Sequence, residues 1–137
     1  MQRTALRRVA ATAVTLVALG AGALATAGTA SAAGKNGGLE SGEFGLYYNS
    51  DQGGAVWDLF VEDPNFWGER FPGPGNGTYE LVNDNTASYN NRDSNRWWVY
   101  TDAGAGGYEG SLPAGYIGNA SATFKNQISS AYYYKGR

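Results

Sequence analysis

The sequence contains no cysteine and no histidine. Small extracellular domains often depend on disulfides because their cores are marginal, so this chain must be stabilised by core packing or by a metal. The absence of histidine excludes Ser-His-Asp and Cys-His nucleophilic catalysis, and it removes the usual imidazole ligands of zinc.

Long apolar runs are confined to the first 32 residues, which have the three parts of a secretory signal peptide. An apolar, alanine-rich run over Val9–Leu24 follows a positively charged start (Arg3, Arg7 and Arg8). Ala30-Ser31-Ala32 matches the small-residue cleavage site. A membrane anchor is the alternative, but the run is short and lacks a charged stop. We therefore expect a secreted, extracellular protein whose mature chain begins at Ala33.

The mature chain is short of positive charge, with seven basic and twelve acidic residues. Its length of about 105 residues fits one domain. A net negative charge does not suit a phosphate-binding surface, so we expect no nucleic-acid partner. We also expect a monomer that has no membrane association once the signal is removed. All four tryptophans and all ten tyrosines lie in this part and should supply much of the core.

The mature chain has no convincing amphipathic helix. Residues 33–42 are rich in glycine and predict a flexible leader. Aromatic and β-branched segments separated by turn residues predict an antiparallel sandwich, with strands near residues 43–49, 55–61, 78–82, 96–101 and 128–134.

Residues 62–77 break this pattern, because their prolines and glycines argue against regular structure. The segment carries three large aromatic residues, namely Phe66, Trp67 and Phe71. They are candidates for a protein-binding loop, since rigid aromatic side chains contribute most to interface energy. The alternative is that they fold back as a lid over the core.

Carboxylates are plentiful but scattered, and no two of them stand out as the pair that a glycosidase needs. They include Asp58, Glu62, Asp63, Glu69 and Glu80. We therefore expect no enzymatic activity and no catalytic residues.

A strand-and-turn unit occurs twice in the chain. Tyr47 stands seven residues before Gly54, and Tyr100 stands seven residues before Gly107. Glycine reaches positive φ without steric cost, so each unit can end in a sharp turn. The repeat predicts two similar motifs, in which Tyr47 and Tyr100 occupy equivalent places.

With a serine near the end of each unit, Ser88 and Ser130, these motifs resemble the βγ-crystallin double Greek key. The resemblance implies an all-β sandwich over residues 43–137, with units at about 43–92 and 96–135. The signal peptide and the Asn83–Asn91 segment make the chain most similar to the secreted bacterial peptidase inhibitors of this fold, which include an actinobacterial metalloproteinase inhibitor. That inhibitor's loop is closed by cysteines, so its inhibitory residues have no counterparts here.

This resemblance implies a secreted, non-catalytic inhibitor that presents a loop to an extracellular proteinase. Two alternatives share the fold. One is a calcium-binding structural or envelope module, and the other is an effector similar to killer toxins.

The family's calcium motif resembles Asn83–Ser88 and Lys125–Ser130. In the family each ion is shared between units, which would pair Asp84 with Ser129 in one site. The other site would pair Asn126 with Ala87, which lacks the hydroxyl. One carboxylate implies weak calcium binding, with a Kd on the order of 10⁻⁴ to 10⁻³ M. The alternative is that both runs are turns whose side chains bond the backbone.

Overall fold

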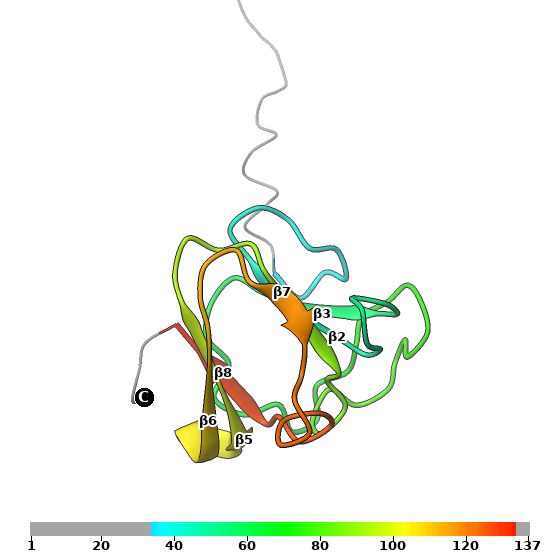
Figure 1. Ribbon diagram of the computed structural model, residues 1–137. Coiled ribbons are helices and arrows are strands. Elements are labelled where there is room, and N and C mark those ends of the chain that lie inside the picture. The colour runs from blue at the N-terminus through cyan, green and yellow to red at the C-terminus, as the bar shows by residue number, and fades with distance from the viewer. Residues whose placement is uncertain (1–33, 134–137) are drawn as a thin grey trace, which may run out of the picture. The chain divides into compact units, whose positions relative to one another are not determined.

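The computed structural model describes residues 34–133, so the predicted signal peptide lies outside the described part of the chain. Two antiparallel sheets make up the domain (Figure 1). One sheet has the order β3-β2-β4-β7 and consists of β2 (Phe44–Tyr47), β3 (Val56–Leu59), β4 (Ser88–Asn91) and β7 (Ile117–Asn119). The other has the order β6-β5-β8 and consists of β5 (Trp97–Asp102), β6 (Gly106–Leu112) and β8 (Ser130–Tyr132).

Each half of the chain pairs with the sheet of the other half. β7 belongs to the second half but pairs with β4 of the first half, so it completes the first sheet (Figure 1). In the opposite direction, Asp63 of the first half forms an isolated bridge with Ala131 in β8. This pairing confirms the predicted double Greek-key sandwich, because each half supplies an edge to the sheet of the other.

The predicted duplication is also confirmed. Tyr47 in β2 pairs with Ser88 in β4, and Tyr100 in β5 pairs with Ser130 in β8. Both serines are fully buried. The two tyrosines therefore occupy equivalent register positions in two similar motifs.

Each buried serine fastens the turn that follows the tyrosine of its own unit. The Ser88 hydroxyl donates to the Asn49 carbonyl oxygen at 2.7 Å, and the Ser130 hydroxyl donates to the Asp102 carbonyl oxygen at 2.7 Å. Each hydroxyl also accepts from the backbone amide three residues after that carbonyl. The Gln52 amide donates to Ser88 at 2.9 Å, and the Ala105 amide donates to Ser130 at 3.3 Å. Because a buried hydroxyl needs partners, the serine and the turn specify each other.

The glycines that end these turns are required by the backbone. Gly54 has φ 75° and Gly107 has φ 74°, a region that favours glycine. A Cβ on Gly54 would lie 2.7 Å from the Asn76 carbonyl oxygen, and one on Gly107 would overlap the Thr101 hydroxyl. The glycine seven residues after each tyrosine is therefore required by the backbone conformation and by the close contacts at that position.

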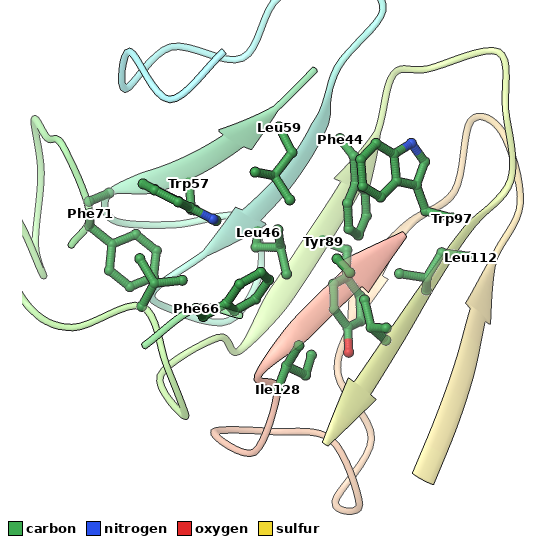
Figure 2. Packing of buried hydrophobic residues seen from close by; sticks show 14 residues of the cluster. Phe44, Leu46, Trp57, Leu59, Phe66, Phe71, Tyr89, Trp97, Leu112 and Ile128 are labelled. Atoms are coloured by element: carbon green, nitrogen blue, oxygen red, sulfur yellow. The ribbon is translucent and has the colours of Figure 1, made fainter. Parts of the chain in front are cut away.

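Aromatic rings from both sheets fill the space between them (Figure 2). Phe44 stacks on Trp97 with ring centroids 4.9 Å apart, and it lies 6.2 Å from the Tyr89 ring. Trp97 is fully buried, and its indole nitrogen donates to an Asp93 carboxylate oxygen at 2.8 Å. Packing of large rings thus provides the stability that disulfides would give a comparable domain.

The strand predicted over residues 78–82 is absent from the structure. Residues 76–79 form a turn, Tyr79 has φ 70°, and the segment contributes the isolated bridge between Arg70 and Leu81. The short strands β4 and β7 were not predicted, because their polar residues give no alternating pattern. The 3-10 turn η3 (Ala103–Ala105) is the helical element among residues 34–133, and it is far too short to span a membrane.

Candidate functional site

The loop over residues 62–77 places its three aromatic residues in opposite environments. Phe66 and Phe71 are fully buried and belong to the core (Figure 2). Trp67 lies between them in sequence and is 76% exposed. The expectation that all three form a binding surface is therefore wrong for Phe66 and Phe71, which fold inward as the lid alternative predicts. Trp67 remains the candidate contact residue.

Hydrogen bonds hold the turn that carries Trp67. The Phe66 amide donates to the Ser129 carbonyl oxygen at 2.9 Å, which ties this turn to the second unit. The Asn65 side chain accepts from the Trp67 amide at 3.0 Å, and the Asp63 carboxylate accepts from the Asn65 amide at 3.0 Å. The indole is thus presented from a turn whose backbone is bonded on both sides of Phe66.

Lys35 connects the N-terminal segment to this loop. Its ammonium lies 2.9 Å from the largely buried Asp63 carboxylate and 3.7 Å from that of Glu69. It also sits 4.9 Å from the centre of the Trp57 ring. A charge held between two carboxylates and an aromatic face restrains the base of the loop.

Residues 34–42, expected to form a flexible leader, are packed against β2 and β3. The cause is a pair of fully buried carboxylates, Glu43 and Asp58. Asp58 accepts from two backbone amides at 2.8 and 3.0 Å, and Glu43 accepts from two others at 2.7 and 3.0 Å. These amides belong to Gly34, Asn36, Gly37 and Glu40.

The Glu40 carboxylate completes an acidic cluster with Glu43 and Asp58, whose oxygens lie within 4.8 Å of one another. Oxygen donors of this kind suit weak calcium binding. In this cluster, however, the oxygens of the two buried carboxylates already accept from backbone amides. The amides therefore offset the cost of burying two negative charges.

Burial raises the pKa of Glu43 and of Asp58 above the usual carboxyl range. The folded state then holds these protons more tightly than the unfolded chain does. This tighter proton binding contributes fully to the free energy of unfolding at pH values below the unfolded-chain pKa of about 4. This contribution is lost as the pH rises through the raised pKa of each group in the folded protein.

We expect Glu43→Gln to flatten the fall in unfolding free energy as the pH rises from about 4 toward neutrality. Urea unfolding at several pH values measures this slope. Glu80→Gln, at an exposed carboxylate, is the matched control and should keep the wild-type slope. Equal slopes in wild type and Glu43→Gln would contradict the prediction.

The predicted calcium pair comes together across the two units. The Ser129 hydroxyl donates to an Asp84 carboxylate oxygen at 3.3 Å. Asp84 has φ 64°, and its amide donates to the Ile128 carbonyl oxygen at 3.1 Å, so the backbone directs the residue toward the second unit. A carboxylate and a hydroxyl oxygen placed together fit an oxygen-preferring cation.

The second predicted pair does not fit a cation. Asn126 has φ 58° and donates its amide to the Thr86 carbonyl oxygen, the mirror of the arrangement at Asp84. A hollow of about 230 Å³ lies there, lined in part by Ala87, Lys125 and Asn126. Ala87 offers no oxygen on its side chain, and the Lys125 ammonium repels cations. The two halves thus keep the same backbone but not the same ligands.

Several residues of this region were not found from the sequence. Lys35 and Glu43 gave no signal, and Asp58 was noted only as one of the scattered carboxylates, because their roles depend on contacts between segments far apart in the chain. Tyr79 was assigned to a strand, yet it is 71% exposed, and the Arg70 guanidinium donates to its carbonyl oxygen at 2.8 Å. The available clue in the sequence was an aromatic residue within a glycine-rich stretch.

No family model matches the sequence, and no curated protein matches it either. Solved structures do match. A structure described as "Evolution of the eye lens beta-gamma-crystallin domain fold" superposes with a TM-score of 0.57 at 18% identity, covering 69% of this chain and 88% of that one. A βγ-crystallin from Ciona intestinalis gives 0.51 at 20% identity, covering 66% and 98%.

A mutant βγ-crystallin domain from Clostridium beijerinckii gives a TM-score of 0.52 at 16% identity, covering 67% of this chain and 98% of that chain. The protein therefore has the βγ-crystallin-type fold. At these identities the likeness concerns the fold, and function has to be argued from the residues described above.

Proposed function

We propose that the protein is a secreted, non-catalytic peptidase inhibitor that presents the loop over residues 62–77 to an extracellular proteinase. The observation that supports this is the exposed Trp67 side chain next to the fully buried Phe66. Burial of Phe66 anchors the loop, while the neighbouring indole stays free for a partner. Tryptophan is enriched among residues that dominate interface energy.

The anchoring favours tight binding. A loop already held by Phe66, Phe71 and the Lys35–Asp63 ion pair loses little conformational freedom when a partner binds. The loop's prolines restrict its conformations further. The secretory signal predicted at residues 1–32 would deliver the protein to the compartment where such proteinases act.

Mixing purified mature protein with a panel of extracellular metallo- and serine proteinases tests this proposal. We expect one class to lose activity in proportion to the protein added, while the inhibitor itself remains uncut. A panel in which every proteinase keeps full activity would count against inhibition. Rapid cleavage within residues 62–77 would show a substrate instead of an inhibitor.

A second candidate function is a calcium-binding structural module, which the pairing of Asp84 with Ser129 favours. We expect 10 mM calcium to raise the melting temperature, since a ligand at ten times its Kd stabilises the folded state by about 1.4 kcal/mol. Asp84→Ala should abolish this rise because it removes the carboxylate. Asn126→Ala should leave it nearly unchanged, because that site lacks a hydroxyl and carries Lys125.

Thermal unfolding with calcium and with a chelator measures the effect for all three proteins. Magnesium at the same concentration controls for ionic strength. No shift in the wild type, or equal shifts in both variants, would show that the polar runs act as turns.

A further inference from the structure

The pairing registers align the two units residue by residue. Leu46 in β2 pairs with Trp57, and Val99 in β5 pairs with Gly110. Leu46 and Val99 each stand one residue before the tyrosine that begins the repeated motif of their unit. Gly110 in the second unit therefore occupies the place of Trp57 in the first, where an indole ring is almost fully buried.

The second unit fills this place incompletely. Phe124 packs toward Gly110, and a Cβ on Gly110 would lie 3.0 Å from the tip of its ring. In the first unit the residue equivalent to Phe124 is Val82, since each lies two residues before the positive-φ residue of its loop. One half-buried phenyl ring thus stands where the first unit has an indole and a valine.

A hollow of about 190 Å³ remains beside Gly110. A cavity of about 150 Å³ is large enough to hold benzene. Apolar and aromatic side chains form much of the wall, including Val99, Leu112, Tyr116 and Phe124. The size and the lining suit one small ring.

Tyr89 also lines this hollow and brings a hydroxyl group to it. Its side chain is 3% exposed, but its hydroxyl is not among the fully buried polar atoms of residues 34–133 that lack a partner, so the oxygen is within reach of solvent. Burial raises the pKa of Tyr89 well above its usual range, so the hydroxyl stays protonated. Two other polar side chains of the wall are already engaged, Ser111 by Arg96 at 2.6 Å and Asn119 by Asp51 at 3.0 Å.

We propose that the hollow beside Gly110 binds a small planar aromatic ring with one hydrogen-bonding group, such as a phenol or an indole. The ring takes the place that the Trp57 side chain fills in the first unit, and its polar group bonds the Tyr89 hydroxyl. The ligand's polar group replaces water at this hydroxyl with a hydrogen bond inside the hollow.

Titration of the ¹⁵N-labelled mature protein with phenol, and separately with indole, tests the proposal by NMR. We expect saturable shifts centred on Gly110, Tyr116 and Phe124, with a Kd on the order of 1 mM for so small a ligand. N-acetyltyrosinamide in a parallel titration shows whether the ring can also come from a polypeptide. Shifts that fail to saturate, or that lie elsewhere, would overturn the proposal.

Two variants locate the site. Tyr89→Phe keeps the ring and removes the hydroxyl, so it should weaken phenol binding about fivefold and leave toluene binding unchanged. Tyr108→Phe, at an exposed tyrosine outside the hollow, is the matched control and should bind phenol like the wild type.

The double variant Gly110→Trp/Phe124→Val copies the first unit into the second and should abolish binding by filling the hollow. If this variant does not fold, Tyr89→Phe still decides the question. Unchanged phenol affinity in Tyr89→Phe would overturn the assignment.

Discussion

Replacing Phe66 with alanine is expected to lower the free energy of unfolding by about 3–5 kcal/mol, the usual cost of removing a buried phenyl ring. Phe66 is fully buried within the aromatic core. Trp67→Ala, one residue further on, should change stability by no more than about 0.5 kcal/mol, because most of its surface is already in water. The costs of truncating two adjacent aromatic residues thus differ by a large fraction of the unfolding free energy of a small domain, which is about 5–15 kcal/mol.

Urea unfolding followed by far-UV circular dichroism measures both values, and it avoids the loss of a fluorescent tryptophan in one variant. If the unfolding free energy of both variants falls with urea at the same slope as that of the wild type, the difference between them is a difference in stability of the folded state. A large loss of stability in Trp67→Ala would show that the indole packs on the domain, and it would remove the basis for the proposed inhibitory contact.

The second large effect concerns inhibition. Once a target proteinase is found, Trp67→Ala should weaken inhibition by about 2 kcal/mol, which is about thirtyfold in the inhibition constant. The reason is that a large aromatic side chain at the centre of an interface buries much area with few rotatable bonds. Inhibition constants of wild type and variant, measured against the same proteinase, give this number.

Tyr108→Ala is the matched control, because Tyr108 is 69% exposed but lies in the second unit, outside the loop. It should inhibit as the wild type does. If Trp67→Ala inhibits normally while Tyr108→Ala does not, the contact lies near the glycine-rich turn that precedes β6. If both inhibit normally, the interface lies on another surface.

The pairing of the two units shows why part of this fold was predictable. Tyr47 and Gly54, like Tyr100 and Gly107, are close in sequence, and the glycine conformation is a local requirement. Local constraints leave a direct trace in the order of residues. The pairing between the two halves left no such trace, because the bridge between Asp63 and Ala131 joins residues from opposite halves.

The candidate sites divide in the same way. Asp84 and Ser129 were predicted together through a family resemblance, and the structure places their side chains 3.3 Å apart. The docking of residues 34–42 was not predicted, because glycine-rich composition indicates flexibility. Only the fold shows that buried carboxylates accept hydrogen bonds from the backbone amides of that segment.

By itself the sequence determined the all-β class, the duplicated turn and the aromatic core, because glycine placement and aromatic content act within single strands and turns. Only the tertiary structure decided that Phe66 points inward and Trp67 outward, that Glu43 and Asp58 are buried, and that Gly110 leaves a hollow. Each of these depends on which distant segment packs against the residue. Adjacent residues of similar chemistry, such as Phe66 and Trp67, can therefore lie in opposite environments, and contacts with distant segments decide which of them is buried.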